Sequence, residues 1–254
     1  MIRRLELPHM TTPVCRLLPF AVADGPRNMA ADEVLLESAA TGIASLRFYA
    51  WDQATASLGY FQAEKVLRDD ARLAGLPFVR RPSGGATLVH HREVTYALAV
   101  PAGAPWQTRA SWLERMHAVI VAALGELGVA ARLCEQESEA HAGGLLCFHR
   151  FTPADIVIGD SKIVGSAQRR QRGALMQHGG ILLEQSPHTP SLPGIRELVN
   201  VDISAPKLCS VIAKSLADAT SWALVAGDWT ATEVSRLEEL ATGKYAAPWW
   251  NSKR

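Results

Sequence analysis

The chain has 254 residues, of which 48% are hydrophobic and 20% charged, and its formal net charge is +1. This composition is typical of a globular protein with enough apolar residues for a core, and it excludes a chain that is disordered over most of its length. The balanced charge provides no overall field toward nucleic acid or an acidic membrane, so we expect neither as a partner.

The cysteines and histidines limit the compartment and the cofactor. The cysteines contain no Cys-x-x-Cys pair, and no charged and apolar leader with a small-residue cleavage site begins the chain. We therefore expect a reduced, cytoplasmic protein, and we expect a monomer. No histidine stands at metal-ligand spacing from a cysteine, so neither a metal nor a cofactor is predicted. The four cysteines are Cys15, Cys134, Cys147 and Cys209.

The first half of the chain alternates strand and helix patterns after a loose arm over residues 1–15. A helix is predicted from Asn28, as its N-cap with acidic residues in the first turn, to Gly42. The patterns that follow are strands at 46–49 and 56–61 with Trp51 and Asp52 in the turn between them, a helix at 64–74, a strand at 78–80, a glycine-rich break at 82–85, and strands at 87–89 and 95–100.

The second half begins with the best marked helix. Ser111 to Glu114 form a capping box, and apolar residues recur at helical spacing up to Gly128. A hairpin follows, with Lys162 at the beginning of its returning strand. The remaining patterns are a strand at 175–183 interrupted by its glycine pair, and helices at 208–224 and 230–240. Because strands come first and helices flank them, we predict one α+β domain over 1–254 with a mixed sheet.

The segment from Arg80 to Gly85 follows one predicted strand and precedes another. Its glycines permit positive φ and a close backbone approach to a ligand, and Ser83 adds a hydrogen-bonding group. A hairpin turn with surface arginines explains the same pattern. The chain has two basic clusters, and such clusters are usually solvated faces; they are Arg80-Arg81 and Arg169, Arg170 and Arg172.

Cys147 and Lys162 are the residues best suited to covalent chemistry. A free cysteine is more often a small buried hydrophobe than a nucleophile, but Cys147 lies next to Phe148-His149-Arg150, whose cationic groups would favour a thiolate. Lys162, fifteen residues later, would contribute a positive charge, although a lysine at a strand start is usually solvated. Together they indicate acyl transfer through a thioester. His90, His91 and His178 are acid–base groups or structural hydrogen-bonders.

Nearly the whole chain resembles the lipoate–protein ligase and octanoyltransferase family, and most closely its cysteine-dependent octanoyltransferases. The resemblance rests on motifs that occur in the family's order, at 28–33, 46–51, 58–62, 78–85, 95–96, 147–148, 162–168, 177–183 and 244–246. It implies a biotin/lipoyl-ligase-like α+β fold in which a mixed sheet, flanked by helices, forms a tunnel for a medium-length acyl chain.

The resemblance also implies site residues and substrates. The acyl-carrying cysteine corresponds to Cys147, and the lysine that contacts the acyl carbonyl corresponds to Lys162. The implied reaction moves an octanoyl group from octanoyl-acyl carrier protein to a lysine of a lipoyl domain, such as that of the glycine cleavage H protein. The implied substrate-binding residues are Arg80, Arg81, Ser83, Gly84, Gly85, Gly165, Ser166, Ala167, Gln177, His178 and Gly179.

Two features depart from the family pattern. The family often has three glycines, or Gly-Gly-x-Gly, followed by His-Asp, whereas this chain has Gly84-Gly85-Ala86-Thr87 and His90-His91.

The alternative functions are an ATP-dependent lipoate–protein ligase, an amidotransferase that moves lipoyl or octanoyl groups between carrier domains, and a carrier-binding module without activity. The ligase would need no cysteine, and the binding module would have no reason to keep both Cys147 and Lys162.

Overall fold

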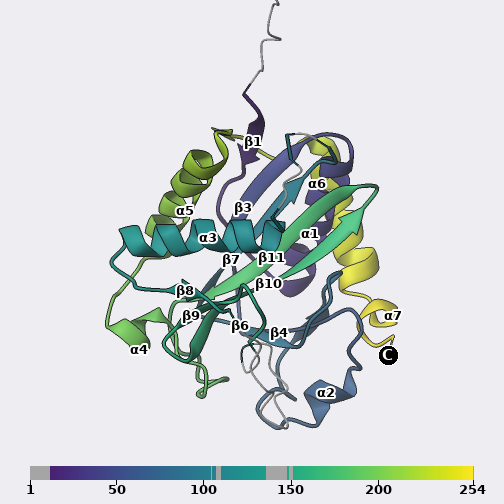
Figure 1. Cartoon of the computed structure of the whole chain (residues 1–254). Coiled ribbons are helices and arrows are strands. Elements are labelled where there is room, and N and C mark those ends of the chain that lie inside the picture. The colour runs from purple at the N-terminus through teal and green to yellow at the C-terminus, as the bar shows by residue number, and fades with distance from the viewer. Residues whose placement is uncertain (1–11, 104, 107–109, 136–147, 149–150, 254) are drawn as a thin grey trace, which may run out of the picture.

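The computed structural model describes residues 12–103, 105–106, 110–135, 148 and 151–253. A nine-stranded mixed sheet forms the centre of the described chain (Figure 1). Its first strands pair in parallel and the strands from β3 onward pair antiparallel. In spatial order the strands are β12 (Ala223–Ala226), β1 (Val14–Leu17), β3 (Ala44–Trp51), β7 (Glu93–Val100), β11 (Ala174–Leu182), β10 (Ser161–Gln171), β9 (Ile156–Ile158) and β8 (Arg132–Leu133), and β2 (Ala21–Ala23) pairs with β3.

A second sheet of three strands supports the glycine-rich segment. It has the order β5-β4-β6, with β5 at Phe78–Arg80, β4 at Thr55–Leu58 and β6 at Leu88–His90. The loop between β5 and β6 contains residues 81–87. The short helix α2 (Lys65–Arg68) connects β4 and β5. The second sheet therefore holds the loop at its two ends.

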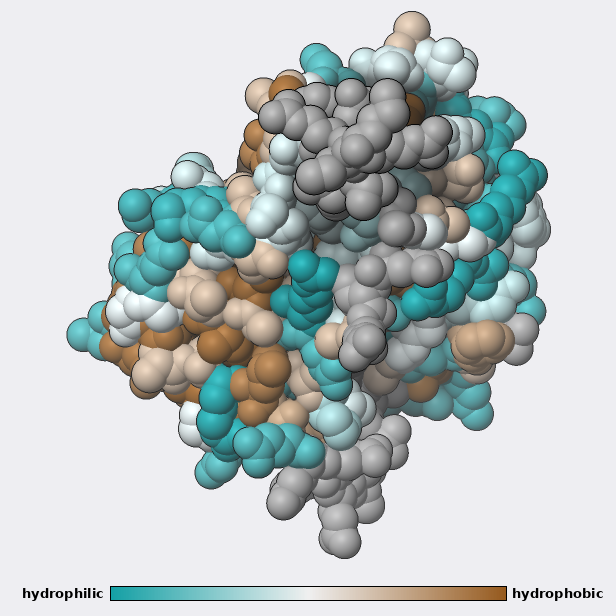
Figure 2. All heavy atoms as spheres, turned by 45° about the horizontal axis from the view of Figure 1, so that its top comes forward, coloured by the Kyte–Doolittle hydropathy of each residue, from teal (hydrophilic) through white to brown (hydrophobic). Residues whose placement is uncertain are grey.

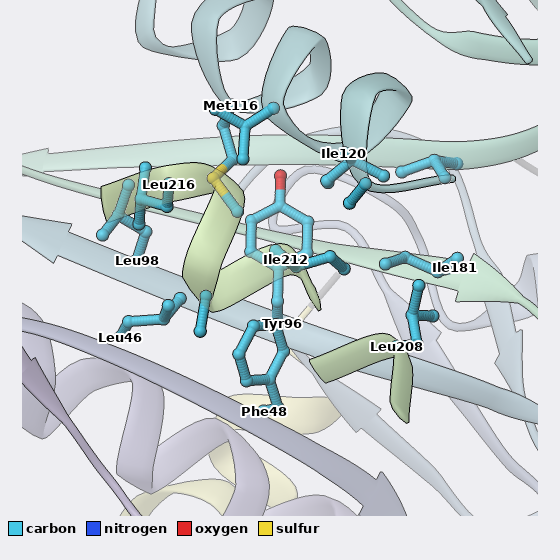
Figure 3. Close-up of a cluster of buried hydrophobic side chains, with 14 of the residues drawn as sticks. Leu46, Phe48, Tyr96, Leu98, Met116, Ile120, Ile181, Leu208, Ile212 and Leu216 are labelled. Atoms are coloured by element: carbon cyan, nitrogen blue, oxygen red, sulfur yellow. The ribbon is translucent and has the colours of Figure 1, made fainter. Parts of the chain in front are cut away.

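Helices cover both faces of the large sheet (Figure 1). On one face, α3 (Trp112–Glu126) and α5 (Ala205–Thr220) bury a cluster whose centre is shown in Figure 3, where Tyr96 rises from the sheet toward Met116 of α3. On the other face, α1 (Gly25–Ala40) and α6 (Ala231–Leu240) close a second cluster. The remaining helical segments are α4 (Ile195–Val199), a π-helix (Ala241–Tyr245) and α7 (Pro248–Asn251).

The α+β prediction is confirmed, and so are the two best capped helices. Ser111 accepts a hydrogen bond from the backbone N–H of Glu114 at 3.2 Å, and Thr230 accepts one from Glu233 at 3.2 Å. Both are capping boxes, in which the glutamate also accepts from the N–H of the capping residue. These helices begin where a local hydrogen-bond pattern begins, which is why their N-termini were predictable.

Several predicted boundaries are wrong. Helix α1 begins at Gly25, and its N-cap is Asp24 rather than Asn28, because the buried Asn28 side chain donates to the carbonyl of Ala23 at 3.0 Å. Trp51 belongs to β3, and the helix predicted at 64–74 is only α2. The predicted loose arm over 1–15 is wrong at its end, since residues 14 and 15 begin β1 and pair with β12; its residues 1–11 lie outside the described part of the chain. Helix α5 ends at Thr220, and the residues after it form β12.

Strand β11 is continuous through its two glycines, contrary to the predicted interruption. A Cβ on Gly179 would lie 2.1 Å from Ser166 Oγ, and one on Gly180 would lie 3.0 Å from a carboxylate oxygen of Glu93. The glycines therefore make room for neighbouring side chains instead of forming a turn.

On the face shown in Figure 2, hydrophobic residues gather on the left with hydrophilic residues around them, and hydrophilic residues predominate on the right. Among the described residues, no helix has the length and apolar character that crossing a membrane requires. In the same part of the chain, no three His, Cys, Asp or Glu side chains are grouped so that they could hold a metal ion.

Candidate active site

A pocket opens between the β5–β6 loop and the β10–β11 pair. It is lined by Arg81, Gly85, Leu88, Gly165, Ser166, Ala167, His178 and Gly179. All but Leu88 were predicted from the sequence as substrate-binding residues. The fold thus brings together segments that lie about 80 to 95 residues apart in the chain, and the substrate-binding role of these residues stays a prediction.

Lys162 is buried next to this pocket. Only 5% of the residue is exposed, and its Nζ lies 2.7 Å from Asp155 Oδ2. The alternative of a solvated lysine at the strand start therefore does not apply to Lys162. Asp155 also accepts hydrogen bonds from the backbone N–H and the hydroxyl of Thr152, at 2.8 and 2.9 Å. An ammonium that is buried, paired and held in this way is a fixed positive charge.

A β-bulge and a glycine set the direction of the lysine side chain. The register of β10 against β9 shifts between Lys162 and Val164, which changes the strict alternation of side chains along the strand. A Cβ on Gly165 would lie 2.6 Å from Lys162 Cε and 3.0 Å from its Nζ. The ammonium therefore lies against the strand at Gly165, which itself lines the pocket.

Cys147, the predicted nucleophile, lies outside the described residues, and so does His149. The next residue after Cys147, Phe148, is buried, and its ring centroid lies 5.5 Å from Lys162 Nζ. Two described cysteines have thiols that are poorly suited to attack: burial raises the pKa of Cys15 to about 12 and that of Cys209 to about 12.

The arginine pair does not form a basic surface patch, because both side chains are buried. The Arg80 guanidinium donates to the carbonyl of Asn251 at 2.7 Å and to the carbonyl of Gly59 at 3.1 Å. Arg81 donates to the carbonyls of Ser57 and Ala86, at 2.8 and 2.6 Å. The prediction of a basic patch here is wrong, since these charges bind main-chain carbonyls; Arg80 holds the C-terminal segment and Arg81 closes the loop.

The glycines of the loop allow two turns to touch. Gly85 has a φ of +95°, a conformation that favours glycine. A Cβ on Gly59 would lie 1.9 Å from the carbonyl oxygen of Gly85, so only glycine at position 59 permits this approach. Gly84 has open space around its Cα and does not line the pocket.

A chain of buried hydrogen bonds links Ser83 to α1. The Ser83 hydroxyl lies 2.6 Å from His178 Nε2, and His178 Nδ1 lies 2.7 Å from Asp32 Oδ2. Arg47 and the Tyr49 hydroxyl also donate to Asp32, at 3.1 and 2.9 Å. Asp32 lies in the motif at 28–33, but nothing in its local sequence indicates this partner.

A second hydrogen-bonded chain runs behind the pocket. Gln177 donates to the Tyr96 hydroxyl at 2.7 Å, and this hydroxyl lies 2.7 Å from Ser166 Oγ. His117 Nε2 lies 2.6 Å from the same Ser166 oxygen, and its Nδ1 donates to the carbonyl of Ala154 at 2.6 Å. Burial lowers the pKa of His117 and raises that of Tyr96 to about 12, so both are neutral at pH 7.

The other predicted histidines lie apart from the pocket. His90 is hydrogen-bonded to Ser57 and Glu93 and stacks on Trp51 with a centroid distance of 3.8 Å. His91 bonds Ser186 at 3.0 Å. The second predicted basic cluster, Arg169, Arg170 and Arg172 at the tip of β10 and β11, is exposed.

Comparison with known proteins supports the family resemblance seen in the sequence motifs. Residues 24–215 match the family described as the lipoyl protein ligase A/B catalytic domain. Octanoyltransferase LipM of Kyrpidia tusciae is 33% identical over 94% of this chain and 98% of its own length. Octanoyltransferase LipM of Moorella thermoacetica has the same identity and the same coverage of both chains.

The fold is also found in solved structures. One is the structure of Ta0514, a putative lipoate protein ligase from T. acidophilum, with bound lipoic acid. Its TM-score to this chain is 0.78 at 21% identity, and the alignment covers 95% of this chain and 99% of Ta0514. A lipoate-protein ligase A bound with ATP has a TM-score of 0.77 at 22% identity, with coverage of 93% and 98%. At this identity the similarity shows a common fold.

Proposed function

The chain belongs to the lipoyl protein ligase A/B catalytic domain family, and we propose that it is an octanoyltransferase of protein lipoylation that carries the octanoyl group on Cys147. The full-length relatives with this activity support the reaction. We further propose octanoyl-acyl carrier protein as the donor, a lipoyl-domain lysine as the acceptor, and the cytoplasm as the compartment. The enzyme works as a monomer and without a cofactor.

In the first half-reaction the Cys147 thiolate attacks the carbonyl carbon of the donor thioester. A new carbon–sulfur bond forms, the carbonyl oxygen becomes an oxyanion, and its collapse expels the thiolate of the carrier, which takes up a proton. One thioester replaces another of similar energy, so no ATP is consumed. In the second half-reaction an acceptor amine replaces the Cys147 sulfur and forms an amide.

Lys162 stabilises the negative charge of both half-reactions. The single observation that supports this role is the buried Lys162–Asp155 pair beside the pocket, with the ring of Phe148, the sequence neighbour of Cys147, over its ammonium. A fixed cation in a site with little water stabilises an oxyanion by several kcal/mol. Asp155 keeps the ammonium in place before the substrate arrives.

The ligase alternative receives less support. A ligase must hold the phosphates of ATP, and in this fold Arg80 and Arg81, beside the glycine-rich loop, would be the cations to contact them. Their guanidinium groups bond main-chain carbonyls instead. The ligase bound with ATP shares the fold at 22% identity, and that similarity shows the fold alone.

The test is a transfer assay with octanoyl-acyl carrier protein and a lipoyl-domain acceptor, without ATP. We expect octanoylated acceptor from the wild-type chain and from Cys134→Ala, which removes a half-buried cysteine thirteen residues before the nucleophile. Cys147→Ala should give none. Octanoate-dependent modification that requires ATP, or full activity in Cys147→Ala, would contradict the proposed function.

A further inference from the structure

Ser83, His178 and Asp32 form a serine–histidine–aspartate chain that meets the pocket at His178. The distances are 2.6 Å from Ser83 Oγ to His178 Nε2 and 2.7 Å from His178 Nδ1 to Asp32 Oδ2. The three residues come from the β5–β6 loop, β11 and α1, and all are buried. His178 lines the pocket. This is the order of groups in which a histidine receives a proton from a hydroxyl.

The surrounding hydrogen bonds define the direction of the protons. Arg47 donates to Asp32 Oδ1 and Tyr49 donates to Oδ2, so Asp32 is an ionised acceptor beside a cation. His178 therefore donates its Nδ1–H to Asp32, and this assignment follows from the network. In the neutral imidazole with this tautomer Nε2 is an acceptor, and the Ser83 hydroxyl donates its proton to it.

The relay lies on the same face of the sheet as Lys162. His178 is paired with Ala167 on β10, and Gly165 precedes Ala167 by two residues on the same face. The Lys162 ammonium lies against Gly165. Two residues along a strand span about 7 Å. An acyl carbonyl held at Lys162 therefore lies near the Ser83–His178 pair.

The second half-reaction requires a proton acceptor that the first does not. The first begins from a thiolate, whereas the acceptor lysine has an unperturbed pKa of about 10.4 and must lose protons before it can form an amide. Lys162 is already engaged as the cation of the buried pair with Asp155. A histidine whose Nε2 lies within hydrogen-bond distance of a hydroxyl, as in His178 and Ser83, meets the requirement.

On the basis of the proposed octanoyl transfer, we propose that Ser83, His178 and Asp32 are the proton relay of the second half-reaction. The acceptor lysine releases one ammonium proton to solvent and attacks as a neutral amine. As its nitrogen–carbon bond forms, an N–H proton moves to Ser83 Oγ and the hydroxyl proton of Ser83 moves to His178 Nε2. The carbon–sulfur bond breaks, Cys147 leaves as a thiolate, and His178 returns its proton to solvent. Asp32 stays ionised and positions the imidazole.

The test separates the two half-reactions in His178→Asn. The asparagine amide can still donate to Asp32, but it cannot take up a proton. We expect His178→Asn to form the octanoyl-enzyme from octanoyl-acyl carrier protein at a rate within a few-fold of wild type, as measured by intact mass. Transfer from the isolated octanoyl-enzyme to a lipoyl-domain lysine should fall on the order of 100-fold or more. His91→Asn, which changes a histidine bonded to Ser186 outside the pocket, should match wild type in both steps.

Hydroxylamine provides the readout that a purely structural role would not change. Its nitrogen is much less basic than a lysine amine, so the N–H proton of its adduct passes to water without the relay, and it should discharge the wild-type and His178→Asn octanoyl-enzymes at equal rates. Ser83→Ala, which removes the hydroxyl without changing charge, should show the same selective loss and serves as the variant if His178→Asn does not fold. If His178→Asn transfers its octanoyl group to lysine as fast as wild type, the relay is contradicted. The relay is also contradicted if the variant loses equal activity toward lysine and toward hydroxylamine. Both outcomes leave the proposed octanoyl transfer itself intact. A wild-type chain that forms no octanoyl-enzyme contradicts the proposed function as well.

Discussion

Replacing Lys162 by alanine tests the buried ion pair and the chemistry together. The substitution removes the ammonium that pairs with the Asp155 carboxylate and leaves a cavity beside it. The carboxylate stays buried and keeps the two hydrogen bonds from Thr152. Removing one partner of a buried pair costs about 3–5 kcal/mol. Because Thr152 continues to donate to Asp155, we expect the lower end, about 3 kcal/mol, which lowers the Tm of a chain of this size by roughly 6–12 °C.

The assay is thermal unfolding at pH 7, followed by circular dichroism, with two comparison variants. Lys162→Met combined with Asp155→Asn removes both charges and should recover most of the lost Tm, because no buried charge remains without its partner. Lys214→Ala removes an exposed lysine that is also ion-paired and should leave the Tm essentially unchanged.

The catalytic effect is measured below the melting transition of every variant. Lys162→Ala should slow octanoyl-enzyme formation by more than about tenfold, which corresponds to about 1.4 kcal/mol of transition-state stabilisation. A Tm equal to that of wild type, or a double variant that is less stable than Lys162→Ala, would refute the reasoning about the buried pair. If Lys162→Ala forms the octanoyl-enzyme at a rate within about tenfold of wild type, Lys162 does not lie at the reacting carbonyl.

The remaining predictions concern the strand glycine, an acid-sensitive ion pair and a buried thiol. Gly165→Ala should displace the Lys162 ammonium and slow acylation with a smaller Tm loss than Lys162→Ala, as kinetics and melting would show. Glu233 is desolvated, which raises its pKa, but hydrogen bonds that include one from Arg16 lower it to about 2; its stabilisation is therefore complete above about pH 4.5 and is lost as the pH falls toward 2. The Tm difference between wild type and Glu233→Gln should narrow over that interval, and a constant difference would contradict this. Cys15, with a pKa of about 12, should resist iodoacetamide at pH 8 in the folded chain, and rapid labelling would show that it is accessible as a thiolate.

The elements that were predictable from the sequence are those set by local hydrogen bonds and periodicity. The capping boxes at Ser111 and Thr230 define the N-termini of α3 and α6, and the turn before Lys162 defines the hairpin of β9 and β10. The end of α5 at Thr220 was not predictable in this way. Its C-cap, Ser221, has a φ of +58°, and the apolar residues after it extend the helical pattern although they pair with β1.

The interactions within the site were less accessible, because their partners are distant in the sequence. Arg80 bonds Asn251, which is 171 residues away. Because the partner is so distant in the sequence, Arg80 is expected on the surface like most arginines, although its side chain is buried. His178 and Asp32 are 146 residues apart, and only the contact of α1 with the sheet joins them. Lys162 and Asp155 are close in the sequence, and an acidic residue before a hairpin was the available signal for that pair.

The most direct test of the central claim locates the acyl group and follows its transfer in one sample. The chain is incubated with octanoyl-acyl carrier protein without ATP, freed of donor, and divided for peptide mass spectrometry and for a chase with a lipoyl-domain acceptor. We predict one octanoyl group on Cys147 that disappears from the enzyme as an equal amount appears on the acceptor lysine. An octanoyl group on Cys134 or another residue, or an octanoyl-enzyme that does not pass its group to the acceptor, would contradict the account.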